Sequence, residues 1–353
     1  MRPIPVTNPP NPWASTAIEW LEEPPTIRLR IFEDATREIL SKNDSPDLGF
    51  RYSINPYRGC FHGCAYCYAR PTHEYLGFGA GSDFERVIVV KPRAAELLRE
   101  AFERPSWKGE AVVFSGGTDC YQPLEASYRI TRACLEVCAE YRNPVHVITK
   151  APLIERDIDV LQRLSEGTHL GVTISVPFWN EANARAVEPG VATPRRRLAT
   201  VRRLREAGID VGVNVAPVIP GLNDADIGPI LEAAAEAGAT RVAMIVVRLP
   251  GSVKQVFEEK LRAALPLRAE RVLARTREVR GGRLNDARFG SRFTGEGTYA
   301  DTITQLFRRT AERLGLAHVS MTTSDEPSPF RRPSKPGRQL ALFEEGGGSG
   351  DAP

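Results

Sequence analysis

The sequence lacks a long apolar run. None of its hydrophobic stretches approaches the roughly 20 residues that a membrane-spanning helix needs. The first residues, MRPIPVTNPPNPW, also lack the apolar core of a secretory signal peptide. These two absences disfavour an integral membrane protein and a secreted protein. They predict a cytoplasmic protein with no membrane partner.

A large excess of one charge is also missing. The chain has 47 basic and 44 acidic residues, a formal net charge of +3, which is too small to indicate nucleic-acid binding by itself. Basic residues gather only locally, in 193–205 and in 330–338. No internal repeat of solenoid period is present either. A length of 353 residues then predicts one large domain or two modest ones.

Cysteine is scarce, but it is not scattered. Three of the six cysteines, Cys60, Cys64 and Cys67, lie within eight residues in the stretch NPYRGCFHGCAYCYAR. In a reducing compartment, clustered cysteines more often bind metal or do chemistry than form disulfides. Three thiolates on one loop are one short of the four that a [4Fe–4S] cluster normally takes. One iron would then stay open for a substrate or cofactor, as one position stays open on a catalytic zinc.

Two other interpretations of the cysteine loop compete with the cluster. A structural zinc would recruit His62 or His73 as its fourth ligand, but zinc sites usually contain two paired ligand units and this loop has one group. Three unrelated structural cysteines are disfavoured because the flanks are glycine-rich and aromatic rather than periodic.

From Phe50 onward, strand and helix patterns alternate. Six segments rich in Val, Ile and Leu alternate with amphipathic patterns, which predicts a parallel sheet covered by helices. Six strands suffice for a partial or open barrel and are two short of a closed eightfold one. The segments are 51–54, 110–117, 144–151, 169–177, 210–220 and 240–250.

The flanks of this core have a different composition. Residues 1–45 predict a partly ordered leader with a short helical pattern at 32–42, before a core at 46–250. Residues 251–320 predict a helical extension, with helices near 252–265, 267–279 and 298–314. The last part, 321–353, is rich in Ser, Pro, Gly and charge and predicts a disordered tail.

The cysteine loop resembles the signature of radical S-adenosylmethionine (SAM) enzymes, C-x3-C-x2-C with an aromatic residue, here Tyr66, before the last cysteine. The resemblance implies an α/β fold, a partial (βα)6 radical SAM barrel, with a [4Fe–4S] cluster on the three cysteines. It implies an open iron that chelates SAM and a 5′-deoxyadenosyl radical that removes a hydrogen atom from a substrate. It also implies Tyr66 packed by the adenine and a reductant such as flavodoxin or ferredoxin.

A narrower resemblance covers roughly residues 31–250. SINPYRGCFHGCAYCYARPTHEYLG together with SGGTDCYQPLE is similar to the spore-photoproduct-lyase-like branch, often called DNA repair photolyases, and most similar to an uncharacterised bacterial group within it. This implies a DNA lesion or nucleotide as the substrate. Modification of a peptide or small metabolite is the alternative enzymatic function. A metal-bound, non-catalytic nucleic-acid-binding protein is the alternative from another class.

Three further segments are candidates for binding SAM. Gly116, Gly117 and Thr118 follow a Val-rich strand at its carboxyl end, where the ligand sites of α/β proteins gather. The resemblance implies that they form the SAM amino-group motif, although the family usually has Glu where Thr118 stands. Ser175 is expected near the SAM ribose, and Asn223 on the adenine side. The alternative for Gly116, Gly117 and Thr118 is a plain turn. Ser175 could instead be a strand residue whose hydroxyl bonds only the backbone, and Asn223 a helix N-cap.

Two cations and the remaining cysteines complete the candidates. Lys150 and Arg248 follow the third and sixth strands and suit the SAM carboxylate or an anionic substrate, or else are surface charges. Cys120, just beyond the Gly-Gly turn, is expected near the cluster mouth. The resemblance implies a thiol that quenches a substrate radical; a small buried apolar residue is the alternative. Cys134 and Cys138 share one helix face and either hold a second cluster with Cys120 or pack in the core.

The tail contains one isolated apolar motif, QLALF at Gln339–Phe343. Isolated Leu and Phe side chains in a solvated segment are suited to a groove on a partner. The pentapeptide resembles the peptide by which bacterial DNA polymerases and repair proteins dock on the sliding clamp. This predicts the sliding clamp as a partner, with packing back on the domain as the alternative.

Overall fold

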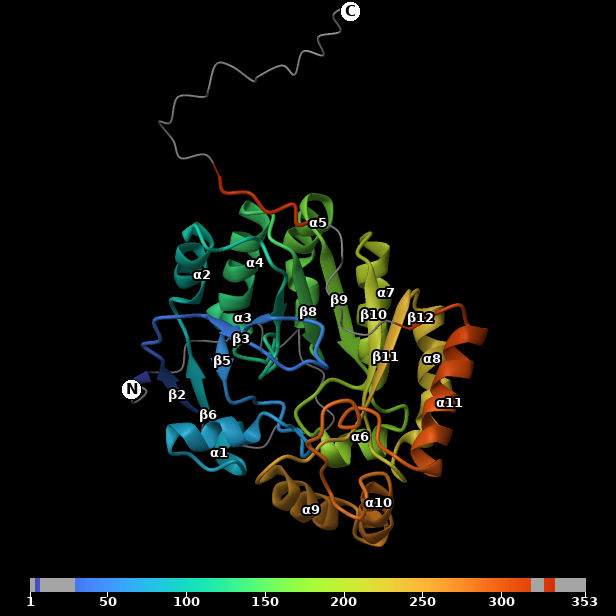
Figure 1. Ribbon diagram of the computed structural model, residues 1–353. Coiled ribbons are helices and arrows are strands. Elements are labelled where there is room, and N and C mark those ends of the chain that lie inside the picture. Colours follow the sequence, from blue (N-terminus) through green and yellow to red (C-terminus); the bar gives the residue numbers. More distant parts are fainter. Residues whose placement is uncertain (1–3, 7–28, 319–326, 334–353) are drawn as a thin grey trace, which may run out of the picture.

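The structure, a computed structural model, describes residues 4–6, 29–318 and 327–333. Its main feature is an eight-stranded sheet of order β12-β11-β10-β9-β8-β7-β4-β3 (Figure 1). The six central strands are parallel and follow one another in chain order. They are β4 (Tyr52–Ile54), β7 (Val112–Phe114), β8 (Val145–Thr149), β9 (Leu170–Ser175), β10 (Val211–Val218) and β11 (Arg241–Val246). The predicted α/β fold with a partial (βα)6 barrel is therefore confirmed.

Short strands border the sheet. Antiparallel β3 (Leu40–Lys42) lies at one end and parallel β12 (Ala317–His318) at the other. Within the described residues these two edges do not pair with each other, so the sheet is open rather than closed into a barrel.

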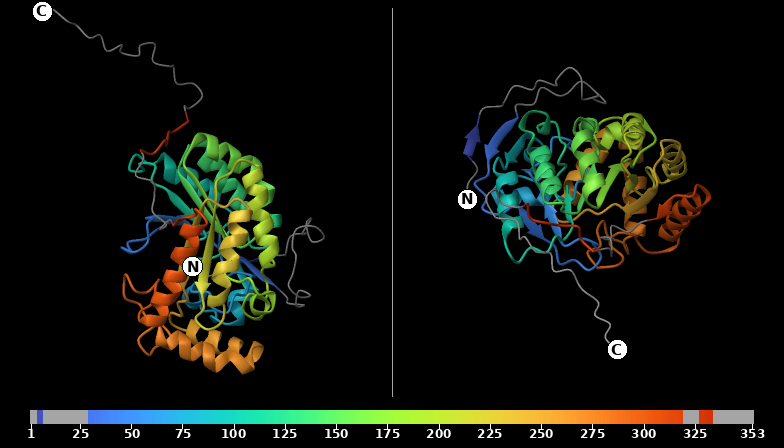
Figure 2. Two further views of the ribbon diagram at one scale, coloured as in Figure 1. Left: turned by 90° about the vertical axis from the view of Figure 1, so that its right-hand side faces the viewer. Right: turned by 90° about the horizontal axis from the view of Figure 1, so that it is seen from above.

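The predicted crossover helices cover the sheet because each carries an apolar stripe (Figure 2). In α5, for example, Val160, Leu161 and Leu164 are fully buried. Their buried faces and the strands share one hydrophobic core. The helices are α2 (Ala94–Glu103), α3 (Glu125–Tyr128), α4 (Ile130–Glu140), α5 (Ile158–Gly167), α7 (Pro194–Glu206) and α8 (Ile227–Glu236), with 3-10 turns η2 (Pro152–Asp157) and η3 (Asp224–Asp226).

A second, smaller sheet corrects two predictions. Its order is β1 (Ile4–Val6), β2 (Arg30–Glu33), β6 (Val87–Val90), β5 (Tyr57–Arg58). The helix predicted at 32–42 is wrong: β2 and β3 occupy the two ends of that segment, because backbone pairing with β6 and β4 overrides the local periodicity. The sequence pattern of 65–77 also predicts a first helix after the cysteines, distorted at Pro71; this segment forms only a 3-10 helix, η1 (Arg70–Leu76), and a short α1 (Ser82–Arg86) follows.

The helical extension lies near the carboxyl ends of the strands. It comprises α9 (Val253–Ala264), α10 (Pro266–Glu278) and α11 (Thr298–Arg313). Helices α9 and α10 lie below α6 (Glu181–Val187) in Figure 1, and α11 packs against α8. Phe257 and Leu261 of α9 share an apolar cluster with Cys64 and Tyr66, so the extension supports the cysteine loop from behind. In the described ranges no helix has both the length and the apolarity to span a membrane.

Part of the predicted disordered tail is ordered against the core. Phe330 packs on Phe102 and Tyr141, with ring centroids 5.9 and 6.2 Å apart, and the Arg332 guanidinium donates to the carbonyl oxygen of Phe102 at 3.0 Å. This segment, 327–333, lies at the end of the molecule opposite the cysteine loop (Figure 1). The QLALF motif at 339–343 lies outside the described residues.

Candidate active site

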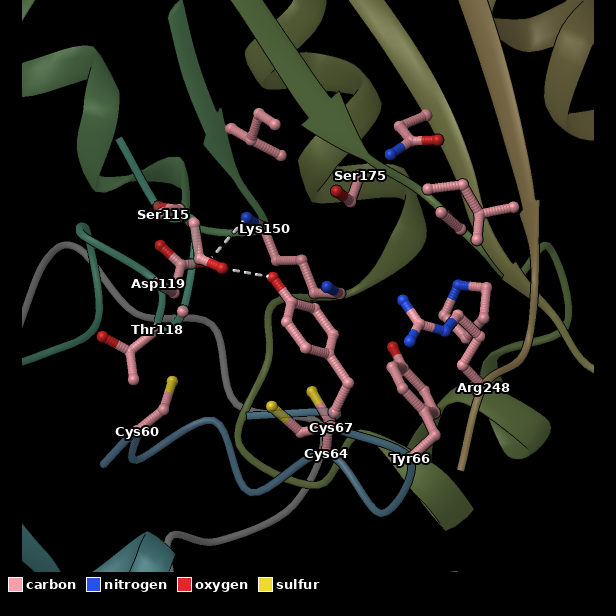
Figure 3. A pocket seen from close by; sticks show the side chains of 18 of the residues that line it. Cys60, Cys64, Tyr66, Cys67, Ser115, Thr118, Asp119, Lys150, Ser175 and Arg248 are labelled. Carbon is pink, nitrogen blue, oxygen red and sulfur yellow. Dashed lines mark hydrogen bonds between the residues drawn. The ribbon is translucent and has the colours of Figure 1, made fainter. Parts of the chain in front are cut away.

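A pocket opens at the carboxyl edge of the parallel strands (Figure 3). Parallel strands bring their carboxyl ends to one edge of a sheet, so residues distant in sequence meet there. The cysteine loop forms one wall, and the segments that end β7, β8, β9, β10 and β11 form the others. Of the predicted site residues, those that line this pocket are Cys60, Cys64, Tyr66, Cys67, Gly116, Gly117, Thr118, Lys150, Ser175 and Arg248.

The three clustered cysteines share one wall of the pocket (Figure 3). Burial raises the pKa of all three thiols, that of Cys64 to about 12. A buried thiol keeps its proton until a metal replaces it, so loading of this wall with metal releases protons.

The donor set fits an iron–sulfur cluster better than a single ion. Among the described residues, no group of three His, Cys, Asp or Glu side chains is arranged to hold one metal ion. His73 bonds the carbonyl oxygen of Val87 at 2.8 Å, and His62 faces Asp119 at 3.4 Å, so neither is turned to complete a zinc site. Three soft thiolates spread over one wall suit separate corners of a cluster.

Glycine and one buried arginine shape the cysteine loop. Gly59 has a φ of +76°, and a Cβ there would lie 2.7 Å from the Val87 carbonyl oxygen, so only glycine fits. Arg70 is fully buried and donates to the carbonyl oxygens of Gly63 and Cys64 at 2.9 and 2.7 Å. It also pairs with Glu85 at 2.5 Å. One guanidinium thus satisfies loop carbonyls that no helix or strand could pair.

The segment after β7 braces this loop. Asn55 Oδ1 accepts from the backbone N–H of Gly117 at 2.6 Å, and Thr118 Oγ1 donates to the Tyr57 carbonyl oxygen at 2.8 Å. Gln122 bonds both Gly59 and Phe61 at 3.1 Å. Asn55 and Gln122 were not among the predicted site residues. Asn55 lies in the cysteine motif and Gln122 in the motif SGGTDCYQPLE, but the sequence does not show that these two motifs contact each other.

Asp119 adds a fixed negative charge beside the pocket. Its side chain is 10% exposed and accepts from Thr149 Oγ1 at 2.6 Å and from the backbone N–H of Lys150 at 2.9 Å. Burial by itself raises the pKa of this carboxyl, but His62 and these donors outweigh burial and hold the pKa well below its usual range. Asp119 is therefore ionised whenever the protein is folded near neutral pH.

Lys150 lies against the same wall. Burial opposes its charge, yet attraction from Cys64, Glu188 and Asp119 is stronger and raises its pKa. Its Nζ lies 5.9 Å from the centroid of the Tyr66 ring. A charged ammonium is thus held at the pocket surface, where it suits a carboxylate.

A buried ion pair positions two of the predicted SAM contacts. The Tyr66 hydroxyl bonds Glu188, whose other oxygen pairs with Arg197 at 2.5 Å, and all three side chains are buried. Arg197 also donates to the Ser175 carbonyl oxygen at 3.1 Å. Tyr66 and Ser175 therefore lie on one rigid network behind the pocket. The sequence showed neither Glu188 nor Arg197, since they come from separate segments.

Two predicted residues do not lie on the pocket wall. Cys120 is fully buried in the main hydrophobic core, with its thiol against the Ser115 side chain; its neighbours Thr118 and Asp119 line the pocket, but Cys120 itself does not. Asn223 is also fully buried, and its side chain bonds the backbone of Ile219 and Pro177 at 2.6 Å each. Its polar atoms are used to fold the loop after β10, which leaves them turned away from the pocket.

The other two cysteines are core residues. Cys134 and Cys138 on α4 are fully buried in the same core as Cys120, and burial raises the pKa of each thiol. The described residues contain no metal-holding group there. The core interpretation of these cysteines is the one that the packing supports.

Comparison with known proteins agrees with this geometry. A family model of the radical SAM superfamily matches residues 54–234, more than half of the chain. The chain belongs to the radical SAM superfamily, and it is an enzyme whose cofactors are a [4Fe–4S] cluster and SAM.

Three relatives illustrate the range of similarity. The uncharacterized protein Rv2578c of Mycobacterium tuberculosis is 38% identical over 241 residues, which are 66% of this chain and 71% of that protein. A radical SAM Nα-GlyT isomerase of Pseudomonas phage M6 is 26% identical over 292 residues, 82% of this chain and 57% of that one. Spore photoproduct lyase, solved with a dinucleoside spore photoproduct, has a TM-score of 0.60 at 18% identity, with 83% and 82% of the two chains covered. The last similarity shows a shared fold.

Proposed function

We propose that this enzyme removes a hydrogen atom from a nucleotide unit of DNA, either a lesion or a base that it modifies. The observation that carries the proposal is the pocket itself, whose lining combines the three cysteines with a set of aromatic and apolar side chains. This set, here called the rim, is Leu48, Phe50, Tyr68 and Phe293. Flat aromatic and apolar surfaces favour a stacked base, whichever base it is.

The relatives support the same substrate class. Spore photoproduct lyase binds a dinucleoside spore photoproduct in a structure of the same fold. The quoted motifs resemble that branch most. Modification of a peptide or small metabolite is the second candidate function. The zinc-bound, non-catalytic alternative is set aside, because the chain belongs to an enzyme superfamily.

The residues of this chain have distinct tasks in the proposed reaction. When bound, the cluster and SAM supply the electron and the radical that abstracts a hydrogen atom. Cys60, Cys64 and Cys67 would hold the cluster; Gly116 and Gly117 expose backbone for the SAM amino group, and Lys150 suits its carboxylate. Tyr66, Ser175 and Thr118 line the remaining cofactor side of the pocket, and the apolar rim excludes water from the radical.

The test is a comparison of substrate classes with the anaerobically reconstituted enzyme. We expect single-stranded or damaged DNA to increase the rate of 5′-deoxyadenosine formation, and deuterium from deuterated DNA to appear in the 5′-deoxyadenosine. Cys64→Ala is the control for cluster-dependent chemistry. Stimulation by peptides or small metabolites, with DNA inert, would favour the second candidate function instead.

We also propose a cytoplasmic location and flavodoxin or ferredoxin as the reductant, because the chemistry needs one electron at low potential and reduced thiols. Substitution of either carrier for dithionite in the same assay tests this. No 5′-deoxyadenosine with either protein would contradict it.

The sliding clamp is the proposed partner of the tail. Residues 327–333 are fixed to the core at the end opposite the pocket, with Arg331 N–H on the Tyr141 carbonyl oxygen at 2.9 Å. The QLALF motif begins six residues beyond this anchor, so docking on a clamp at this end would leave the pocket accessible to DNA.

Binding of the full-length chain to immobilised clamp tests this partner. We expect micromolar binding that is lost when Leu342 and Phe343 of the QLALF motif are both changed to Ala. Phe330→Ala serves as the matched control, because it releases the anchor without changing the motif. Equal binding by the double variant would contradict the proposal.

A further inference from the structure

One cation of the pocket, Arg248, has a buried guanidinium nitrogen without a hydrogen-bond partner among the described residues. Arg248, two residues beyond the end of β11, lines the pocket on the side opposite Ser115, Thr118 and Asp119 (Figure 3). Its Nε atom is buried and bonds no atom of the described residues. Its guanidinium carbon lies 5.0 Å from the centroid of the Phe293 ring. An unpaired buried donor destabilises the folded protein, and this one therefore calls for an explanation.

The neighbouring arginines do have partners. Arg292 pairs with Asp47, with Nε 2.6 Å from Oδ2. Arg288 pairs with Asp286 and Glu296 at 3.0 and 2.8 Å. Arg280 donates to the carbonyl oxygens of Val246 and Val247 at 3.0 and 2.7 Å. Arg288 and Arg292 thus have carboxylate partners, and Arg280 has two carbonyl acceptors, although its Nε is also unpaired among the described residues. Arg248 differs from these three because it lines the pocket.

Arg248 and Lys150 face different parts of the pocket. Lys150 is compensated by the carboxylates of Glu188 and Asp119, which lie on the cysteine side. Arg248 lies among Phe293, Tyr68 and the Asp47–Arg292 pair instead. Burial, together with repulsion from Arg292, lowers the pKa of Arg248, as expected of a cation that lacks its counter-ion.

The rim around Arg248 is held in place. The Asp47–Arg292 pair joins the 43–50 segment to the 280–297 segment, and Asp47 also accepts from the backbone N–H of Gly290 at 3.4 Å. These two segments supply Phe50 and Phe293 to the pocket lining. A phosphate at Arg248 would thus lie beside surfaces suited to the attached base.

We propose that Arg248 binds a phosphate of the substrate, with the Phe293 ring as the platform for its guanidinium and the Asp47–Arg292 pair as the support of that platform. This inference rests on the proposed function, because a nucleotide is the substrate class that carries both a base and a phosphate. A planar guanidinium suits phosphate because it can donate two parallel hydrogen bonds.

The experiment compares Arg248→Gln and Arg248→Lys with the matched control Arg288→Gln, whose side chain is exposed and paired outside the pocket. Each reconstituted holoenzyme is titrated with a fluorescent single-stranded oligonucleotide at several salt concentrations. We expect Arg248→Gln to bind about tenfold more weakly, with a salt slope smaller by about 0.7. Lysine restores part of the affinity, and Arg288→Gln stays within about twofold. The SAM affinity of every variant is measured in parallel.

The other outcomes are distinguishable. Unchanged oligonucleotide binding by Arg248→Gln overturns the inference and leaves the proposed function intact. Loss of SAM affinity instead assigns Arg248 to the SAM carboxylate and also overturns it. If the wild-type enzyme binds no oligonucleotide, the proposed function fails. Titration with inorganic phosphate then tests the anion site by itself. Phosphate binding that is lost in Arg248→Gln supports an anion site at Arg248, and equal phosphate binding by the wild-type enzyme and Arg248→Gln overturns it.

Discussion

The six cysteines form two groups of three with opposite surroundings. Cys60, Cys64 and Cys67 lie on a loop that lines a pocket, whereas Cys120, Cys134 and Cys138 lie in the main hydrophobic core. Burial raises the pKa of thiols in both groups. Neither burial nor thiol acidity therefore separates a ligand from a core residue. The backbone does, because the loop turns the thiols of the first group onto one open wall.

The largest expected effect comes from breaking the first group. Cys60→Ala removes one of three thiolates, so we expect almost no iron after anaerobic reconstitution and no SAM cleavage. Iron and sulfide content with visible absorption measure it. Cys134→Ala is the matched control and should keep a full cluster. Equal iron in the two variants would contradict the assignment of the cluster to the loop.

The buried arginine under the loop should come next. Arg70→Met removes the guanidinium donor from the carbonyl oxygens of Gly63 and Cys64, which keep only the longer bonds from Lys260 Nζ at 3.4 Å and the Cys67 N–H at 3.3 Å. Glu85 keeps Lys260 as a partner. We expect a loss of about 3 kcal/mol in the free energy of unfolding and faster loss of the cluster to a chelator. Denaturant titration and chelation kinetics measure the two effects. A stable protein with wild-type chelation kinetics would show that the loop holds its shape without Arg70.

A glycine pair separates backbone strain from crowding. Gly59 and Gly77 have φ values of +76° and +77°, but only at Gly59 would a Cβ meet other atoms, with Val87 O at 2.7 Å. We expect Gly77→Ala to cost about 1 kcal/mol through strain and Gly59→Ala to cost at least about 2 kcal/mol and to lower cluster retention. Thermal unfolding and iron content of the two variants test this. Similar losses of stability and iron in the two variants would mean that the cysteine loop shifts to accommodate a Cβ at Gly59.

The sequence predicted the parts of the site that local pattern encodes. Val-rich segments such as 210–220 are largely buried in the sheet, so their composition predicted the six central strands. The spacing of Cys60, Cys64 and Cys67 likewise predicted that they act together. Both signals are contained within a few neighbouring residues.

The missed parts depend on contacts between distant segments. Arg197 and Glu188 lie behind Tyr66, and Gln122 bonds Gly59 and Phe61, but no local pattern marks these side chains as neighbours. The wrong helix at 32–42 has the same origin, since pairing of β2 with β6 decides its conformation. Asn223 was placed in the pocket from its loop, while its hydrogen bonds to the backbone turn it inward.

The smallest expected effect concerns the second cysteine group. Cys120→Ala removes one sulfur atom from a fully buried site, so we expect a loss of about 1–2 kcal/mol in the free energy of unfolding, with cluster content and substrate-free SAM cleavage unchanged. Because Ser115 lies between this thiol and the pocket, substrate turnover should also persist. Cys138→Ala, equally buried, is the matched control for packing. If Cys120→Ala alone diverted the product or stopped turnover, the thiol would have to reach the substrate, and the division between the two cysteine groups would fail at this residue.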